Sequence, residues 1–485
     1  MDREESGGVP VVTAEDYVSA ERFLNGEGLV FNAEVNPHWL SDSQRFWYRS
    51  RTRDGCEFIL VEPDPGVRRQ AFDHQRLASA LSVASADPCV HHQLPFDEFE
   101  FTEDERAIVF ETDRQRWRCD LDTYSCTKTA EDEDSPGPGV TSPDGRWTAF
   151  VRNHNLHVTD DSGRVLTLTE DGGPGCDYAV PVPSPLRAAG IDPADGPSPA
   201  LLWSPDSHRI LTHRISCEGA GQFHLVQSVP LDGNTRPKLH SYTYPLPGDE
   251  RVPLAELVIL DVRERTRCPV QADPLPVLYY GSPLRPEWTW WSGDGTRIYV
   301  VRRERGYQGY SLIEIDAETG ESRTVLEEQA RTAIDPHLTS MGSPNIRTMS
   351  DGEEVIWFSQ RDGWGHIYLY DGEGNLRNRI TSGHWAVADI VCVDEKGRRV
   401  YFTGVGREPG RDPYYCHLYR ASLDGGDPEL LTPEDAHHEI AFSPDGSCFI
   451  DTYSRIDLPP VSVLRTRDGR GARHLAGNRD SVRDR

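Results

Sequence analysis

The sequence predicts an all-β protein, an eight-bladed β-propeller of four-stranded antiparallel blades with short N-terminal helices. Three observations support this fold class. A turn signal followed by a short aromatic or β-branched run recurs eight times along the 485 residues. The signals are 40 to 88 residues apart, whereas a propeller blade needs roughly 40–50 residues, so the longer intervals imply inserted loops. Helical periodicity is sparse, and 42 Gly with 36 Pro indicate many turns.

The N-terminal residues 1–40 form the predicted helical lead-in to the propeller. Residues 13–24 show a helical pattern, with Thr13 as the N-cap and Asp16 three positions later. A second helix is expected over residues 72–83. The propeller itself is assigned to residues 41–469, and residues 470–485 are assigned to a polar C-terminal tail.

The eight turn signals mark the starts of the blades, at residues 41, 102, 142, 204, 292, 350, 394 and 443. The clearest copy reads SPDG at residues 142–145 and precedes a strand-like run over residues 147–151. Pro and Asp favour the turn, and Gly accepts the positive φ that ends it. The run after each turn is expected to be a buried strand, and a second strand often follows, as at residues 156–158 and 367–370. Together these strands and the turns after them indicate the meander of one blade.

The longest interval, from residue 204 to residue 292, contains a polar and proline-rich stretch over residues 228–253. We call this stretch the arm and expect it to connect two strands of the fourth blade. Such a connection can hold a partner domain or a second copy of the chain. A plain surface loop is the equally weighted alternative.

Composition and charge exclude several classes of function. Lys and Arg total 51 against 79 Asp and Glu, which gives a net charge of −28. No basic stripe is present, so nucleic-acid phosphates and anionic lipids are poor partners. No window approaches 18 apolar residues, and the first five residues lack the pattern of a secretory signal. We therefore expect a cytoplasmic protein that binds neither nucleic acid nor membranes.

Cysteine and histidine positions give no sign of a metal centre. The ten cysteines are scattered, without a CxxC pair or zinc-ligand spacing. Cys119 and Cys126 are placed to face each other across a hairpin, although reduced thiols are the favoured interpretation. His437 and His438 are expected in a surface loop, and adjacent side chains of an extended chain cannot share a metal. Neither a metal nor a cofactor is predicted.

Longer phrases go beyond this architecture. Residues 142–160 read SPDGRWTAFVRNHNLHVTD and residues 358–371 read FSQRDGWGHIYLYD. HLYR at residues 417–420 is then followed by DLPP at residues 457–460. In this order and spacing the phrases resemble the N-terminal β-propeller of the dipeptidyl peptidase IV branch of the prolyl oligopeptidase superfamily. The resemblance extends over about residues 13–469.

The resemblance implies a propeller that covers an α/β-hydrolase domain. In that family the hydrolase domain follows the propeller in sequence and carries the catalytic Ser, Asp and His. The sequence of this chain contains neither the Gly-x-Ser-x-Gly nucleophile elbow nor a His-Gly-Gly oxyanion segment. We therefore expect no serine peptidase activity from this chain alone.

A second departure from the family concerns the α-amine of a peptide substrate. Aminopeptidases of the family carry a Glu-Glu pair after an Asp-aromatic dipeptide, and the two carboxylates neutralise that amine. Asp177 and Tyr178 match the dipeptide here, but Ala179, Val180 and Pro181 follow in place of the acidic pair. The resemblance therefore gives no reason to expect that this chain takes part in the removal of dipeptides from a free N-terminus.

A small molecule or peptide is expected to bind in the central channel or at one of its mouths, where loops from successive blades converge. An anionic or carboxylate-bearing ligand fits best, because one arginine-rich stretch supplies cations in an acidic protein. Salt bridges between blades are the alternative role for these arginines. The candidate contacts are Asp177, Tyr178, Arg302, Arg303, Arg305, Tyr307 and Ser343.

Two classes of function remain. The first is a substrate-binding, gating or interaction module without peptidase activity of its own, which partners a hydrolase domain or, through the arm, a second copy. The second is a propeller recruited as a non-peptidase enzyme for a small molecule, for example in secondary metabolism. Its central pocket would then supply Asp, Glu, His or Tyr as acid or base.

Overall fold

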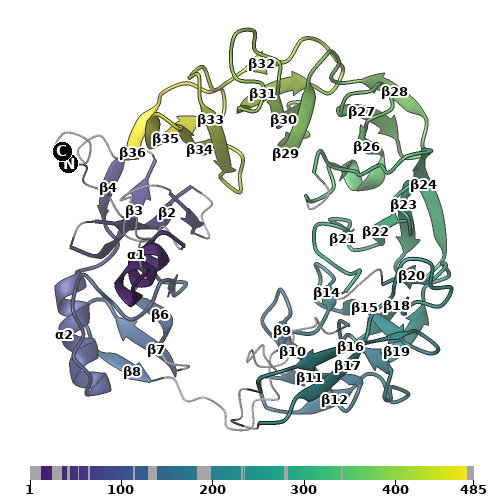
Figure 1. Ribbon diagram of the computed structural model, residues 1–485, viewed down its shortest axis with the longest axis horizontal. Coiled ribbons are helices and arrows are strands. Elements are labelled where there is room, and N and C mark those ends of the chain that lie inside the picture. The colour runs from purple at the N-terminus through teal and green to yellow at the C-terminus, as the bar shows by residue number, and fades with distance from the viewer. Residues whose placement is uncertain are drawn as a thin grey trace, which may run out of the picture.

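The computed structural model describes residues 12–24, 35–40, 44–52, 54–63, 66–112, 115–128, 139–182, 198–230, 233, 235–277, 282–339 and 342–477. Its sheets follow one another in a ring, with the strands of each blade running from the inside of the ring to the outside (Figure 1). This arrangement confirms the predicted eight-bladed β-propeller of four-stranded antiparallel blades.

The first three blades are regular meanders in which neighbouring strands are antiparallel. Blade 1 holds β1 (His38–Trp39), β2 (Phe46–Arg51), β3 (Cys56–Glu62) and β4 (Val67–Gln70). Blade 2 holds β5 (Glu100–Phe101), β6 (Ala107–Thr112), β7 (Gln115–Asp120) and β8 (Cys126–Lys128). Blade 3 holds β9 (Val140–Thr141), β10 (Trp147–Arg152), β11 (Asn155–Asp160) and β12 (Val165–Thr167).

Blade 4 departs from the four-stranded pattern. Its sheet orders β13 (Cys176–Tyr178), β15 (Arg209–Ser216), β18 (Leu254–Asp261) and β19 (Thr266–Pro269), with β14 (Leu201–Trp203) added to β15 and β20 (Leu275–Pro276) to β18. A separate ribbon of β16 (Gln222–Gln227) and β17 (Lys238–Thr243) is inserted between β15 and β18. The arm therefore connects strands of this blade as predicted, and it contains β17.

Blades 5 to 8 return to the regular meander. Blade 5 holds β21 (Thr289–Trp291), β22 (Arg297–Arg303), β23 (Gly309–Asp316) and β24 (Ser322–Gln329). Blade 6 holds β25 (Arg347–Met349), the 3-10 turn η1 (Ser350–Gly352), β26 (Glu354–Ser359), β27 (His366–Asp371) and β28 (Leu376–Arg379). Blade 7 holds β29 (Ala386–Asp394), β30 (Arg399–Val405), β31 (Cys416–Ser422) and β32 (Glu429–Leu430). Blade 8 holds β33 (His437–Phe442), β34 (Cys448–Arg455), β35 (Leu458–Thr466) and β36 (Arg473–Gly477).

Two α-helices lie among the described residues, both near the predicted positions. Helix α1 (Ala14–Leu24) begins after Thr13, whose backbone N–H donates to the Asp16 carboxylate at 2.7 Å. Helix α2 (His74–Ser85) begins two residues later than predicted, because Asp73 caps it by accepting from the backbone N–H of Gln75 and Arg76. None of the helices described here is long and apolar enough to cross a membrane.

The recurring turns are held by the same side-chain bonds in several blades. In blade 8, the Ser443 hydroxyl donates to Asp445 at 2.7 Å and accepts from the backbone N–H of Cys448 at 3.1 Å. Asp445 in turn accepts from the backbone N–H of Ser447 at 3.0 Å. Equivalent bonds fix the turns that begin at Thr102, Ser142, Ser204 and Ser292. In these five turns, the hydroxyl of Ser or Thr and the carboxylate of Asp therefore close the turn before the long strand of the blade.

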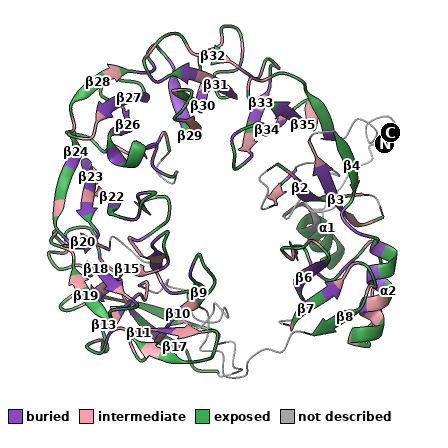
Figure 2. Ribbon diagram, turned by 180° about the vertical axis from the view of Figure 1, so that it is seen from behind, coloured by how far each residue is buried: buried purple, intermediate pink, exposed green. Residues whose placement is uncertain are grey.

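Apolar clusters join neighbouring blades to one another. Buried residues lie along the strands, whereas connecting loops are mostly exposed (Figure 2). Separate clusters join blade 1 to 2, 3 to 4, 4 to 5, 5 to 6, 6 to 7, 7 to 8 and 8 to 1. Among the residues described, no such cluster joins blade 2 to blade 3. We call this place the seam.

The ring closes between blade 8 and blade 1 by side-chain packing. Phe46, Tyr48 and Ile59 of blade 1 share a buried cluster with Ile450 and Leu464 of blade 8. The Tyr48 hydroxyl also donates to the backbone carbonyl of Leu475 at 3.2 Å. Each of these two blades keeps its own four strands, so no strand is exchanged where the ends of the propeller meet.

The structure moves the C-terminal boundary predicted for the propeller. The outer strand of blade 8, β36 (Arg473–Gly477), lies within residues 470–485, which the sequence assigned to a polar tail. Leu475 and Ala476 are buried there against blade 1, which explains why this segment adds to the sheet. At the other boundary, β1 already begins at His38, and the turn predicted at residues 41–43 lies outside the described residues.

Candidate functional site

Arg303 lies at the end of β22 in an aromatic and acidic setting. Its guanidinium lies 4.5 Å from the ring centre of Trp288 and 5.1 Å from that of Tyr307. The same group forms an ion pair with Asp335, and both side chains are largely buried. Burial raises the pKa of Asp335, and the positive charge of Arg303 opposes that rise. Arg303 and Tyr307 of the predicted cluster are therefore brought together.

Arg302 precedes Arg303 on β22, and its ion pair is a long one. Its guanidinium lies 3.6 Å from the carboxylate of Asp273, and the Asp273 side chain is 86% exposed. Both arginines line a hollow of about 110 Å³. The rest of its wall is mainly aliphatic and aromatic, formed by residues that include Leu275, Val277, Ser282, Pro283, Trp288 and Val301. Arg285 lines it as well, so the hollow combines apolar walls with three arginines.

Arg305 is directed away from this hollow. It donates to the backbone carbonyl of Leu246 at 2.8 Å and to that of Asp249, both of which belong to the arm. Tyr307 adopts a positive φ of 59°, and its carbonyl accepts from the backbone N–H of Ile334 at 2.7 Å. The turn that carries these residues therefore fastens the arm on one side and the loop after β24 on the other.

Ser343 lines a second and larger hollow of about 620 Å³ beside the inner strands β21 and β25. Arg347 also lines it and donates to the backbone carbonyls of Pro344 and Ile346, each at 2.8 Å. Burial lowers the pKa of Arg347, while the charge of Asp389 opposes that fall. Further walls come from Glu287, Trp290, Trp291, Asp351 and Glu395. Ser343 is among the predicted contacts, whereas the acidic residues around it are not.

Asp177 and Tyr178 lie elsewhere, between blades 3 and 4. Tyr178 is fully buried in the cluster that joins these blades, and its hydroxyl donates to Asp171 at 2.8 Å. Burial raises the pKa of Tyr178 to about 12. The carboxylate of Asp177 bonds to the Nδ1 atom of His154. The two residues line neither of the hollows described above.

His337 forms a contact that no sequence pattern indicates. Its Nε2 atom donates to Asp389 at 2.6 Å, and its Nδ1 atom accepts from the backbone N–H of Thr339 at 3.0 Å. The residue sits in the loop after β24, whereas Asp389 belongs to β29, and only the folded ring brings them together. Both ring nitrogens are occupied, so the pair fixes the loop to blade 7.

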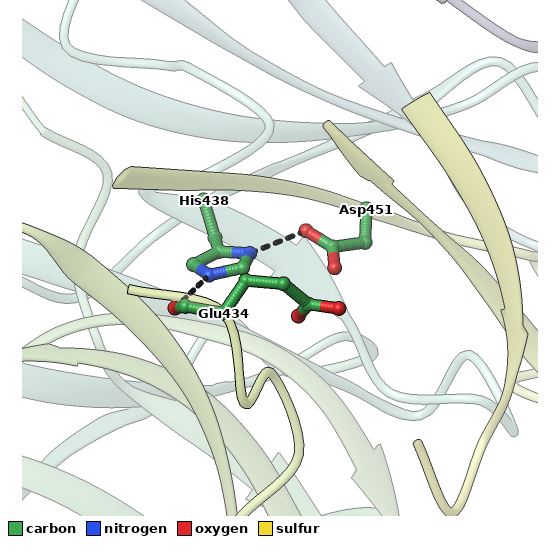
Figure 3. Close-up of side chains that lie close together, drawn as sticks. All are labelled: Glu434, His438 and Asp451. Atoms are coloured by element: carbon green, nitrogen blue, oxygen red, sulfur yellow. Dashed lines mark hydrogen bonds and ion pairs between the residues drawn. The ribbon is translucent and has the colours of Figure 1, made fainter. Parts of the chain in front are cut away.

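His438 is the centre of a buried ionic cluster in blade 8 (Figure 3). The structure places it in β33, fully buried, so the surface loop expected from the sequence is wrong. Its Nδ1 atom lies 2.6 Å from Asp451, and its Nε2 atom lies 3.1 Å from the backbone carbonyl of Glu434. Both ring nitrogens of His438 therefore have a polar partner inside the blade.

The side chains of Glu434, His438 and Asp451 offer ligand atoms of the kind that bind metals. However, Arg465 donates to Asp451 at 2.9 Å and to Glu434 at 2.7 Å. Burial raises the pKa of Glu434, but the hydrogen bond and charge of Arg465, together with a backbone hydrogen bond, outweigh it and leave that pKa lowered. The Arg465 guanidinium thus already pairs with both carboxylates, and the cluster serves the packing of blade 8.

Comparison with protein families gives one match over most of the chain. Residues 102–182 and 196–460 match the family model described as the dipeptidyl peptidase IV (DPP IV) N-terminal region. Dipeptidyl peptidase 4 of Trichophyton rubrum is 26% identical over 345 residues, which are 68% of this chain and 41% of that protein. The probable dipeptidyl peptidase 4 of Emericella nidulans is 24% identical over 344 residues, with 70% and 43% covered. The chain therefore spans less than half the length of these curated relatives.

Solved structures show the same fold. The crystal structure of Porphyromonas gingivalis dipeptidyl peptidase 4 is similar with a TM-score of 0.67 at 19% identity, covering 99% of this chain and 63% of that one. A putative dipeptidyl aminopeptidase IV from Bacteroides ovatus gives a TM-score of 0.63 at 16% identity, with 92% and 61% covered. In both cases part of the solved chain extends beyond the region that matches.

Proposed function

This chain belongs to the family of dipeptidyl peptidase IV N-terminal regions, and on that premise we propose that it is a binding or gating module without peptidase activity of its own. Its ligand is a small molecule or peptide that carries a carboxylate. The observation that supports this proposal is the hollow beside β22, where Arg285, Arg302 and Arg303 meet apolar walls. A carboxylate can pair with a guanidinium while the attached apolar group fills the hollow.

Arg302 is the arginine that we assign to the ligand. Arg303 is already paired with Asp335 and enclosed by two aromatic rings, so its role is to shape the wall. Among the described residues, the ion-pair partner of Arg302 is the exposed carboxylate of Asp273 at 3.6 Å, an ion pair that water weakens. A ligand carboxylate that displaces Asp273 would form a less solvated and stronger contact with Arg302.

The test compares a ligand with and without its charge. We expect N-acetyl-Ala-Pro with a free carboxylate to bind more tightly than its carboxamide, measured by isothermal titration calorimetry. Arg302→Ala should weaken binding of the acid about tenfold, the cost of one charge-assisted hydrogen bond, and leave the amide unchanged. Arg467→Ala is the matched control, since Arg467 pairs with Asp394 on another blade. An undiminished preference for the acid in Arg302→Ala rejects the assignment.

The absence of peptidase activity is tested separately. The sequence contains no Gly-x-Ser-x-Gly motif, which a serine nucleophile of this superfamily needs. We expect no labelling by a fluorophosphonate probe and no turnover of Gly-Pro or Ala-Pro reporter substrates. Turnover that such a label abolishes would overturn this part of the proposal.

A non-peptidase enzyme acting on a small molecule is the second candidate function. The observation that favours it is a serine–histidine contact at the same hollow, where the Nε2 atom of His213 lies 2.7 Å from the hydroxyl of Ser282. Burial lowers the pKa of His213 to about 4, so the imidazole is neutral and its Nε2 atom can accept the hydrogen bond of the Ser282 hydroxyl. Under this alternative, Ser282→Ala abolishes turnover but leaves ligand binding intact.

We further propose that the arm and its ribbon contact a hydrolase domain or a second copy of the chain. Apolar side chains on the ribbon are exposed, among them Phe223, Val226 and Leu239. Exposed apolar residues that gather on one element are typical of an interface. Sedimentation of the unmodified chain and of the Val226→Lys and Leu239→Lys variants tests the self-association.

A further inference from the structure

Cys119 and Cys126 lie directly opposite each other in blade 2. Strands β7 and β8 pair with Cys119 in register with Cys126. The backbone N–H of the next residue, Asp120, donates to the carbonyl of Ser125 at 3.1 Å. The two cysteines therefore form a non-hydrogen-bonded pair, in which Cα atoms lie about 4.5 Å apart and side chains approach closely. A disulfide requires Cα atoms roughly 4.4–6.8 Å apart, so the backbone is already positioned for one.

The two thiols are chemically unequal. Both are buried and free, and they hydrogen-bond to each other. The hydrogen bond from Cys119 lowers the pKa of Cys126, whereas that bond and burial raise the pKa of Cys119. Cys126 lies on the edge strand and is 9% exposed, whereas Cys119 is fully enclosed, so Cys126 is the thiol that attacks first and Cys119 is the thiol that resolves the product.

Access to Cys126 depends on the edge of the blade. Strand β8 (Cys126–Lys128) has three residues and is the outermost strand of its sheet. Edge strands as short as this open locally more easily than central ones, and opening uncovers Cys126. A third cysteine, Cys89, packs against the same apolar cluster, and burial followed by the charge of Cys126 raises its pKa.

We propose that Cys119 and Cys126 form a reversible disulfide with a small-molecule disulfide as the oxidant. The Cys126 thiolate attacks one sulfur of the oxidant, forming a mixed disulfide and releasing one thiolate. The Cys119 thiolate then attacks the Sγ atom of Cys126 and releases the second thiolate. The protein loses two protons and two electrons, and the electrons reduce the oxidant to two thiols.

The position of this pair gives the reaction a structural consequence. Blade 2 has an apolar cluster on its blade 1 side and none toward blade 3 among the described residues. A disulfide ties the edge strand β8 covalently to β7 on the blade that borders the seam. Oxidation therefore slows the opening of this edge, and reduction restores it.

The test uses oxidised and reduced glutathione on the full chain. Both cysteines fall in a single tryptic peptide, residues 119–128, because Arg118 precedes it and Lys128 ends it. After incubation with oxidised glutathione and alkylation of free thiols, we expect this peptide unalkylated and lighter by two hydrogens. Reduced glutathione should restore the doubly alkylated form. Cys268→Ser, a cysteine on blade 4, is the matched control and should behave like the unmodified protein.

Single substitutions identify the role of each thiol. In Cys119→Ser, Cys126 should retain one glutathione, because the resolving thiol is missing. In Cys126→Ser, Cys119 should stay free and alkylate only after denaturation. Hydrogen exchange of the β8 amides should slow at least severalfold on oxidation of the unmodified chain. The proposal is overturned by two alkylated thiols in fully oxidised glutathione, or by a link from Cys126 to Cys89.

Discussion

At the residue scale, buried histidines on the blade strands differ in their partners. His438 lies 2.6 Å from the carboxylate of Asp451 and 3.1 Å from a backbone carbonyl inside blade 8. His213 and His417 have no carboxylate partner of this kind among the described residues, and burial is the main cause that lowers the pKa of each to about 4. These two histidines are therefore neutral at neutral pH.

These neutral histidines predict a loss of stability in mild acid. The unfolded chain protonates His213 near its ordinary pKa of about 6.5, whereas the folded chain resists protonation down to about 4. The unfolded state therefore binds more protons between these values, and the free energy of unfolding falls as the pH falls from about 6.5 to about 4. The loss approaches about 3 kcal/mol for each histidine.

His213→Gln provides the measurement. It removes the titrating group while keeping a polar side chain that can bond to Ser282. We expect urea denaturation of this variant to show a smaller loss of stability between pH 6.5 and 4.5 than the unmodified protein. An equal loss in both would show that His213 does not control the acid response.

At the scale of elements, the recurring turn explains why the blades were predictable. Ser and Asp two positions apart close the turn by local hydrogen bonds, so a few residues determine it. The following apolar runs and the N-cap residues of the two helices are equally local. Local features of this kind are enough to place the blades, the helices and the arm from the sequence alone.

We predict that the turn at Ser443 depends on its aspartate. Asp445→Ala removes the acceptor of the Ser443 hydroxyl and of two groups on Ser447. The expected cost is about 1–2 kcal/mol in the free energy of unfolding, since partly exposed local hydrogen bonds are weak. Thermal unfolding of this variant should be compared with Asp427→Ala, which changes an exposed aspartate in another turn. Equal midpoints for the two variants would contradict the prediction.

The candidate site was harder to predict from the sequence than the fold was. Arg302, Arg303 and Tyr307 lie within six positions of one another in the sequence. That they lie near one another could therefore be predicted from the sequence alone. The pairing of Arg303 with Asp335, and of His337 with Asp389, joins separate loops and depends on how the blades pack. Tyr178 was expected from a family phrase to contact a ligand, and the structure places it in the buried cluster between blades 3 and 4.

At the scale of the whole molecule, packing between blades is uneven around the ring. Blades 6 and 7 have an apolar cluster on both sides, whereas blade 2 has one on a single side within the part of the chain described. The order of the blades around the ring was predicted from the sequence. The difference in apolar packing between one pair of neighbouring blades and the next was not. It depends on side chains that meet only after each blade has formed.

Hydrogen exchange should reveal the seam. Under reducing conditions we expect the amides of β6 (Ala107–Thr112) to exchange about tenfold faster than those of β30 (Arg399–Val405), although both are second strands of their blades. A blade packed on one side opens at a lower free energy than one packed on both. Mass spectrometry of peptides covering the two strands measures the difference. Equal protection would mean that the seam does not weaken blade 2.

The closure between blades 8 and 1 has a consequence for the order of the chain. Val35 and Ala476 belong to one buried cluster, and Arg473 donates to the backbone carbonyl of Pro63 at 2.5 Å. No strand crosses this junction. The chain can therefore begin and end at a different junction while the blades keep the same order around the ring. A circular permutant that starts at blade 3, ends at blade 2 and links blade 8 to blade 1 by a short peptide keeps every strand pair. Its new ends lie at the seam, where the described residues have least packing to disturb, and such a gene can present fused domains two blades away from the junction of blades 8 and 1.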